Sequence, residues 1–474
     1  MKQIRWHINL TLIVCFSLVC PLTYAATIHV PAEQPTIQSG IDAAQNGDTV
    51  LVDDGVYTGE GNVNLDFKGK RITLKSRNGA EATIIDCEKK LETRGFIFQN
   101  KETVASVLDG FTIKNGNQKF GGGIYLNTSS PTIKNCVIDS NQSIPGGGGG
   151  IDCINSDPII TDCTITRNFG GGIFIIGNSE HKGVILKEPL TQPTLKNSTI
   201  AENTGHGIYC MRDVNPIIDN CVISHNSARG ILYTYASLTS NPITNCRIEH
   251  NAGGGLETWE NSVLKIENSI IVRNTARSGG GISCNYNSEI WVSDCLIAHN
   301  SATSFGGGIL VTTILGAVNI KHCTITENTA GTAGGGVYAY SHRDPIIRRN
   351  RFNLTDSIVW GNSSNGAHAE VSVRGSGIVI KSCDIGQGLA GIEAGFGGQV
   401  ADGDKFIYED NIDADPLFID ADSGNFRLKP NSPAVGMGVR ERAFQTGPFA
   451  VSQHGKQLVR WADLKRKPHI TSTY

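Results

Sequence analysis

Lysine and aspartate recur at equivalent places in neighbouring segments of the chain, where together they could transfer protons. Lys196 lies two residues before Ser198, and Asp219 lies two residues before Cys221. A lysine can take a proton beside a carboxylate or neutralise the carboxylate's charge. An aspartate can orient that lysine or hold calcium, which makes calcium a conceivable cofactor, and Arg212 offers a second cation. We therefore consider Lys196, Asp219 and Arg212 as candidate catalytic residues.

Four other residues are candidates for holding a ligand. Glu267 occupies the place of Asp219 two segments later, so the two carboxylates would lie about 9.6 Å apart on strands of one sheet. Trp259 and Tyr209, like Trp291, are expected to point outward and to offer flat rings. Asp213 lies in a nearby turn. The alternative interpretation of all these residues is a solvated surface with mixed charges.

These segments belong to a long internal repeat. Cys136-Val-Ile-Asp-Ser-Asn141 recurs as Cys163-Thr-Ile-Thr-Arg-Asn168, and the units start 23 to 35 residues apart. Asparagine fills the sixth position of nine consecutive units: Asn141, Asn168, Asn203, Asn226, Asn251, Asn274, Asn300, Asn328 and Asn362. Gly-Gly-Gly-Ile or a relative follows most of them, and then a third apolar stretch. Each unit therefore holds three short runs with the period-2 alternation of strands.

Three short strands in a unit of about 25 residues predict a coil in which each strand pairs in parallel with its copy in the next unit. Inward positions should then stack like on like. The residue two before each Cys or Ser position should point outward. These outward residues are Lys134, Thr161, Lys196, Asp219, Thr244, Glu267, Ser293, Lys321, Thr355 and Lys381.

The cysteines are expected to fill the interior as mostly free thiols, because a buried cysteine behaves as a small apolar residue. One column holds Cys136, Cys163, Cys221, Cys246, Cys295, Cys323 and Cys383, and a second holds Cys153, Cys210 and Cys284. Several of them adjoin a serine in the next unit, which leaves no consistent pairing scheme.

The asparagines are expected to take left-handed turn angles and to form a hydrogen-bonded ladder between units. His225, His250 and His299, which each precede one of them, are interpreted as turn residues, and no metal site is assigned.

The ends of the chain suggest export from the cell. Lys2 and Arg5 precede the apolar run 10–22 and the small residues before position 26, which is the pattern of a signal peptide. Loss of residues 1–25 would change the formal net charge from −3 to −5, and such a near-neutral chain is not expected to bind nucleic acid. No later stretch is apolar and long enough for a transmembrane segment.

The repeat, with its Asn-Cys-x-Ile-x-x-Asn and Gly-Gly-Gly-Ile patterns, resembles the parallel β-helix repeats of the pectate-lyase-like superfamily. Residues 36–57 resemble the entry segment of that group, and residues 415–434 resemble the closing segment of many bacterial surface β-helix proteins. The resemblance implies an all-β, right-handed parallel β-helix of about a dozen rungs, with three strands per rung and a short N-terminal capping helix. The predicted segments are a signal peptide (1–25), the cap and first rungs (26–105), regular rungs (106–388), a closing segment (389–439) and a basic tail (440–474).

The resemblance also implies a function outside the cell or at its surface, in the bacterial envelope. We expect the protein, as a monomer, to bind or degrade acidic extracellular polysaccharide, in the second case as a polysaccharide lyase or a related carbohydrate-active enzyme. The alternative is a non-catalytic surface or adhesion protein whose solenoid is a rigid scaffold, which the absence of a complete catalytic motif favours. A loop over Lys196 and Asp219, expected between residues 177 and 193, favours the first.

Overall fold

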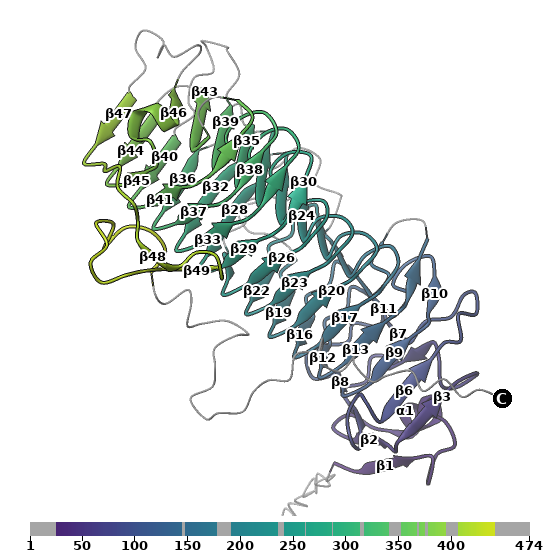
Figure 1. Ribbon diagram of the computed structural model, residues 1–474. Coiled ribbons are helices and arrows are strands. Elements are labelled where there is room, and N and C mark those ends of the chain that lie inside the picture. Colours follow the sequence, from purple (N-terminus) through teal and green to yellow (C-terminus); the bar gives the residue numbers. More distant parts are fainter. Residues whose placement is uncertain are drawn as a thin grey trace, which may run out of the picture.

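The computed structural model describes residues 25–144, 147–177, 191–235, 241–260, 262–286, 288–312, 317–340, 352–366, 369–374, 378–394 and 406–440. The chain coils into an elongated rod, with residues near the N-terminus at one end and β47 at the other (Figure 1). Three long parallel sheets, here called A, B and C, run along it, and each rung passes from C to A to B. The predicted all-β, right-handed parallel β-helix is confirmed.

Sheet A has 15 strands among the described residues: β1 (Thr27–Val30), β2 (Thr49–Val52), β5 (Thr73–Ser76), β8 (Val107–Asp109), β12 (Thr132–Lys134), β16 (Ile159–Thr161), β19 (Thr194–Lys196), β22 (Ile217–Asp219), β25 (Ile243–Thr244), β28 (Val263–Glu267), β32 (Glu289–Ser293), β36 (Val318–Lys321), β40 (Phe352–Thr355), β44 (Ile378–Lys381) and β47 (Phe406–Glu409).

Sheet B has 13 strands in the described part of the chain: β3 (Gly55–Tyr57), β6 (Thr83–Asp86), β9 (Thr112–Lys114), β13 (Val137–Asp139), β17 (Thr164–Thr166), β20 (Thr199–Ala201), β23 (Val222–Ser224), β26 (Arg247–Glu249), β29 (Ile270–Val272), β33 (Leu296–Ala298), β37 (Thr324–Thr326), β41 (Ile358–Trp360) and β45 (Asp384–Ile385).

Sheet C likewise has 13 described strands: β4 (Leu65–Asp66), β7 (Phe96–Phe98), β11 (Ile124–Asn127), β15 (Ile151–Ile154), β18 (Ile173–Ile176), β21 (Ile208–Met211), β24 (Ile231–Thr234), β27 (Leu256–Trp259), β31 (Ile282–Asn285), β35 (Ile309–Thr312), β39 (Val337–Tyr340), β43 (Val371–Arg374) and β46 (Ile392–Ala394).

Short strands pair at the corner between sheets B and C. They are β10 (Asn117–Gln118) with β14 (Gln142–Ser143), and β30 (Thr275–Ala276), β34 (Ser301–Ala302), β38 (Thr329–Ala330) and β42 (Ser363–Ser364). A 3₁₀ helix, η1 (Gly388–Gly391), precedes β46.

The interior is built mostly from stacked small and branched side chains, as the alternation predicts, with packed phenylalanine rings in the first rungs. The eleven cysteines in the described residues are all free and buried. Those of the first column lie at the A–B corner, where each thiol donates to the carbonyl two residues earlier, as from Cys136 to Lys134 at 3.1 Å. Serine fills the same slot in the same way, since the Ser198 hydroxyl donates to the Lys196 carbonyl at 2.7 Å. The slot therefore requires a small donor and no disulfide partner.

The ladder asparagines are buried at the B–C corner, and the predicted ladder is present. The side-chain amide of each donates to the side-chain oxygen of the next at 2.9–3.1 Å. The predicted left-handed angle at these asparagines is wrong. The residue just before the asparagine adopts it, for example His250 with φ of 55° before Asn251. The ladder places the asparagine amide inward, so the preceding residue makes the turn from sheet B toward sheet C. His225, His250 and His299 are such turn residues, as expected.

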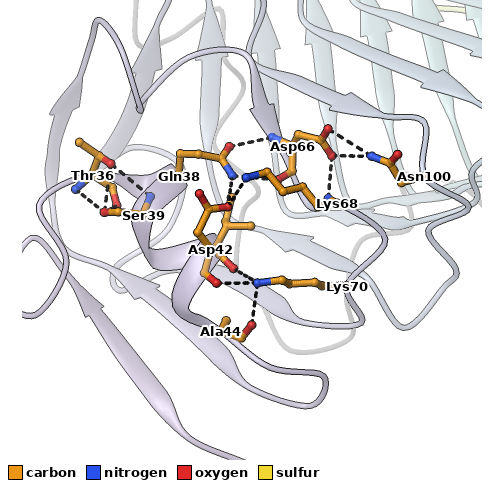
Figure 2. A network of polar contacts seen from close by, with 10 residues as sticks. Thr36, Gln38, Ser39, Asp42, Ala44, Asp66, Lys68, Lys70 and Asn100 are labelled. Atoms are coloured by element: carbon orange, nitrogen blue, oxygen red, sulfur yellow. Dashed lines mark hydrogen bonds and ion pairs between the residues drawn. The ribbon is translucent and has the colours of Figure 1, made fainter.

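The predicted capping helix is α1 (Ile37–Ala43), and it closes the first rung. Ile37 and Ile41 are fully buried under it. Polar contacts fix the end of this helix (Figure 2). The Lys70 ammonium donates to the carbonyls of Ile41, Asp42 and Ala44 at 2.7–2.8 Å. The Asp42 carboxylate pairs with Lys68 at 2.7 Å. These bonds satisfy the helix's last carbonyls, which otherwise lack partners.

The closing segment returns along the rod. Its hairpin, β48 (Phe418–Asp420) and β49 (Asn425–Leu428), packs on the outer face of sheet B. Phe426 is buried there against Val272, Leu296 and Ala298, which are apolar at outward positions of β29 and β33. Arg440 forms an ion pair with Asp294. The hairpin thus covers an apolar patch on this face. Residues 1–24 and 441–474, with the predicted signal sequence and nearly all of the basic tail, lie outside the described residues.

Candidate functional site: the outer face of sheet A

The predicted outward row on sheet A is confirmed residue by residue through the strand register. Each member is the register partner of the next: Lys134, Thr161, Lys196, Asp219, Thr244, Glu267, Ser293, Lys321, Thr355 and Lys381. Lys196 and Asp219 are therefore neighbours on β19 and β22, and Asp219 and Glu267 lie two strands apart.

The Asp219 carboxylate turns toward the rung that follows it. One of its oxygens accepts from the Thr244 hydroxyl at 2.8 Å and from the Asn245 side-chain amide at 2.7 Å. Lys196 is exposed, and no residue of the described chain forms an ion pair with it. The lysine is thus available to an outside anion. The carboxylate is oriented by amide and hydroxyl donors, which a calcium ion would have to compete with.

Arg212 and Asp213 lie on the opposite side of sheet A from Lys196, where the strands of this sheet begin. They follow β21 at the C–A corner, both with positive φ, whereas Lys196 and Asp219 end their strands at the A–B corner. The length of a sheet A strand separates the two groups. The predicted overhanging loop falls almost entirely on residues 178–190, outside the described residues, with its Glu180, His181 and Lys182.

A groove of about 370 Å³ lies farther along sheet A, on strands β28 to β40. Its lining is Lys265, Glu267, Trp291, Val292, Ser293, Asn319, Ile320, Lys321, Asn353 and Thr355. The register resolves the outward residues into two rows along the rod. One row is Lys265, Trp291, Asn319 and Asn353, and the other is Glu267, Ser293, Lys321 and Thr355.

Trp291 is the largest exposed side chain of the groove. It is 46% exposed, and its indole N–H donates to Glu289 at 2.7 Å, which holds the ring in place. Lys265 precedes it in the same row. Lys321 lies one strand beyond it in the other row and pairs loosely with Asp356 at 3.7 Å. A ring flanked by two cations therefore faces solvent.

Sequence reasoning identified part of this groove and missed the rest. Glu267, Trp291 and Lys321 were all predicted to point outward. Lys265, Asn319 and Asn353 were not among the predicted outward residues. Each lies four residues before a Cys or Ser position of the repeat, so the alternation places it outward too. The period-2 alternation would have identified them, because the strands here have four or five residues. Each strand therefore has a second outward position, two residues before the predicted one.

The predicted aromatic residues lie on strands of sheet C. Trp259 ends β27, and its ring lies 4.9 Å from that of Tyr286 at the C–A corner. Tyr209 is half-buried between Phe174 and His206, with ring centroids 5.1 and 5.4 Å away. Trp259 thus lies close to the strands that form the groove, whereas Tyr209 packs against its neighbours on sheet C.

Within the described residues, no three His, Cys, Asp or Glu side chains gather as metal ligands would. The imidazoles of His225 and His250 stack at 4.7 Å.

Three acids with raised pKa values are buried away from this face: burial raises the pKa of Asp152 and Glu370 to about 7 and that of Asp384 to about 6. These acids belong to the scaffold and not to the groove.

Comparison with known proteins decides the family. The family model described as "Right handed beta helix region" matches residues 38–188 and 182–352. The chain belongs to this family. No curated protein sequence matches this β-helix. Among the described residues of the β-helix, no helix has the length and apolar character needed to cross a membrane.

Solved structures resemble this right-handed β-helix at low identity. The A-module of a mannuronan C-5 epimerase from Azotobacter vinelandii has a TM-score of 0.43 and 14% identity, covering 78% of this chain and 94% of its own. A pectate lyase has a TM-score of 0.35 and 13% identity, covering 87% and 91%. A periplasmic alginate epimerase has a TM-score of 0.31 and 14% identity, covering 73% and 84%. Such distant likenesses carry no argument about activity.

Proposed function

We propose that the protein binds an acidic extracellular polysaccharide along the groove on sheet A. The observation that carries the proposal is the exposed ring of Trp291 between Lys265 and Lys321. An indole offers an apolar face to the carbon side of a sugar ring, and the ammonium groups on either side offer partners to its carboxylates. Asn319, Asn353, Ser293 and Thr355 add amides and hydroxyls of the kind that hydrogen-bond to sugar hydroxyls.

The form of the groove suits an extended ligand. Four neighbouring strands span about 14 Å along the rod at the normal strand spacing. The two outward rows run in that direction, so a polymer chain lying along the rod would meet two outward side chains at each strand. An extended ligand can contact all four strands at once, which a single small molecule would not. The signal-peptide pattern at the start of the chain supports a place outside the cell, where such polymers occur.

A lyase activity is a second candidate, favoured by the register pairing of Lys196 with Asp219. In such a reaction the lysine would remove the proton from the carbon beside a uronate carboxylate. The electron pair would form a carbon–carbon double bond as the glycosidic oxygen leaves, and that oxygen would take up a proton. Without this activity, the same β-helix would serve as a binding scaffold.

The binding proposal is tested with Trp291→Ala, using affinity electrophoresis in gels that contain polygalacturonate, alginate or neutral dextran. We expect the wild type to be retarded by a uronate polymer and not by dextran, and the variant to lose at least tenfold in affinity. Trp360→Ala, which removes an outward tryptophan from sheet B, is the matched control and should bind like the wild type. Equal migration of wild type and Trp291→Ala in every gel would refute the proposal.

A further inference from the structure

In six of the described rungs, the residue at one position of the C–A corner has a side chain and adopts left-handed backbone angles. The members of this column that have a side chain and positive φ are Thr128, Asn155, Arg212, Tyr235, Glu260 and Tyr286, with φ between 46° and 55°. Asparagine or glycine adopts this conformation at the least cost, and a bulky aromatic residue adopts it rarely. Two tyrosines in such a column are therefore unexpected on conformational grounds.

The side chains of these two tyrosines also contribute little to the hydrophobic core. Tyr235 is 58% exposed and Tyr286 is 54% exposed, so neither ring fills the core. Left-handed angles recur at corner residues throughout the described chain, so Tyr235 and Tyr286 are set apart by the large exposed rings that they bear at such a corner. The two rings therefore point to a role outside folding.

The surroundings of the two rings are mixed in character. Tyr286 lies 4.9 Å from the ring of Trp259, at an angle of 33° between the planes. A hydrogen bond to Glu260 raises the pKa of the Tyr235 hydroxyl, and the nearby exposed Arg212 opposes that rise. The column thus presents ring faces alternating with an acid and a cation. A membrane would need a broader apolar surface, and nucleic acid would need more positive charge.

We infer that Tyr235, Trp259 and Tyr286 form an aromatic strip that binds the rings of a saccharide chain at the edge of the sheet A groove. Tyr286 is followed within three residues by β32, which carries Trp291, and Trp259 within four by β28, which carries Lys265. Aromatic rings with polar tips suit a ligand that has apolar ring faces and a hydroxyl rim. The inference rests on the proposed function, since it gives the same polysaccharide a second line of contact.

The test is a Tyr235→Asn/Tyr286→Asn double variant, measured for melting temperature and for affinity toward the uronate polymer that the wild type binds. Asparagine suits the backbone angles better, so we expect a melting temperature at or above that of the wild type. We expect the dissociation constant to rise at least tenfold. Thr128→Asn makes the same backbone change in the same column, several rungs away, and should leave the affinity unchanged.

Three outcomes would overturn the inference. If Trp291→Ala weakens binding and the double variant binds normally, the groove binds the polymer and the strip does not. A melting temperature of the double variant clearly below the wild type would show that the tyrosines serve the packing of the corner. If the wild type binds no uronate polymer, the proposed function fails and the inference fails with it.

Discussion

Asn362 donates both its backbone N–H and its side-chain amide to one carboxylate oxygen of Glu370, at 3.3 and 2.7 Å. Each earlier ladder asparagine donates to the next asparagine in the same way, so Glu370 takes the place of a tenth asparagine. Burial raises the pKa of the Glu370 carboxyl to about 7, against the opposing effect of these two hydrogen bonds. The ladder therefore ends on an acid that changes its charge near neutral pH.

The first prediction is that Glu370 makes the folded protein less stable as the pH rises. The folded chain holds a proton that the unfolded chain releases near the ordinary pKa of 4.5, so the free energy of unfolding should fall between about pH 4.5 and pH 7. The loss is on the order of 3 kcal/mol. Glu370→Gln should match the wild type at low pH and exceed it at pH 8 in urea-induced unfolding.

Comparison with the wild type isolates this effect, because Asp152 and Asp384 change stability in the same direction in both proteins. Parallel pH profiles for the wild type and Glu370→Gln would mean that this carboxyl titrates normally.

The second prediction is that Asn251→Ala strongly destabilises the fold. The Asn251 amide donates to the Ile223 carbonyl and to Asn274, both at 3.0 Å, and its oxygen accepts two bonds from Asn226. Alanine would leave several buried groups without partners, at about 1–3 kcal/mol for each. Thermal unfolding should show a clear drop.

A contrasting variant is Asn197→Gly, at an exposed corner position with φ of 50°, where glycine adopts the angle freely. Its melting temperature should stay near that of the wild type. If the two variants were equally stable, the buried ladder would contribute nothing.

The third prediction is that the mature protein contains eleven reduced cysteines. All eleven in the described residues are buried and free, and those of the first column donate to nearby backbone carbonyls. Alkylation in denaturant without reductant should label eleven thiols, and reductant should not change the melting temperature. Detection of intramolecular bridges by mass spectrometry would contradict the columns of free thiols.

The fourth prediction concerns lyase activity. If the protein cleaves a uronate polymer, Lys196→Ala should abolish the unsaturated product, seen by its ultraviolet absorbance, and should leave the melting temperature unchanged because the side chain is exposed. Lys134→Ala is the matched control, since Lys134 occupies the same row but pairs with Asp109 at 3.4 Å. Lys321 is unsuitable as a control because it lines the groove.

Absence of product from the wild type, with and without calcium, would rule out the lyase. The β-helix would then be a binding scaffold. Loss of activity in Lys134→Ala and its retention in Lys196→Ala would place the reactive lysine elsewhere on the row.

The architecture could be predicted from the amino-acid sequence alone, because a β-helix is specified by a local period that is repeated many times. The spacing of the Asn and Cys positions predicted which residues pair between strands, and the register from Lys134 to Lys381 follows it without a shift. Like residues stack at a fixed interval, so an error in one unit would conflict with all the others. The thiol columns followed from the same alternation, and the capping helix was implied by the resemblance of residues 36–57 to the entry segment of the pectate-lyase-like group.

The tertiary structure was needed to place the chemistry-bearing side chains relative to one another. It separated Arg212 from Lys196 by a strand's length, and it turned Asp219 toward Asn245. The left-handed backbone angle is found at His250 and not at Asn251, because the Asn251 side-chain amide is buried in the ladder. The tertiary structure also brought the hairpin with Phe426 back over sheet B and opened the groove around Trp291. Contacts between side chains of different rungs depend on their rotamers. Contacts between distant segments depend on the path by which the closing segment packs back onto the β-helix. A local sequence period specifies neither.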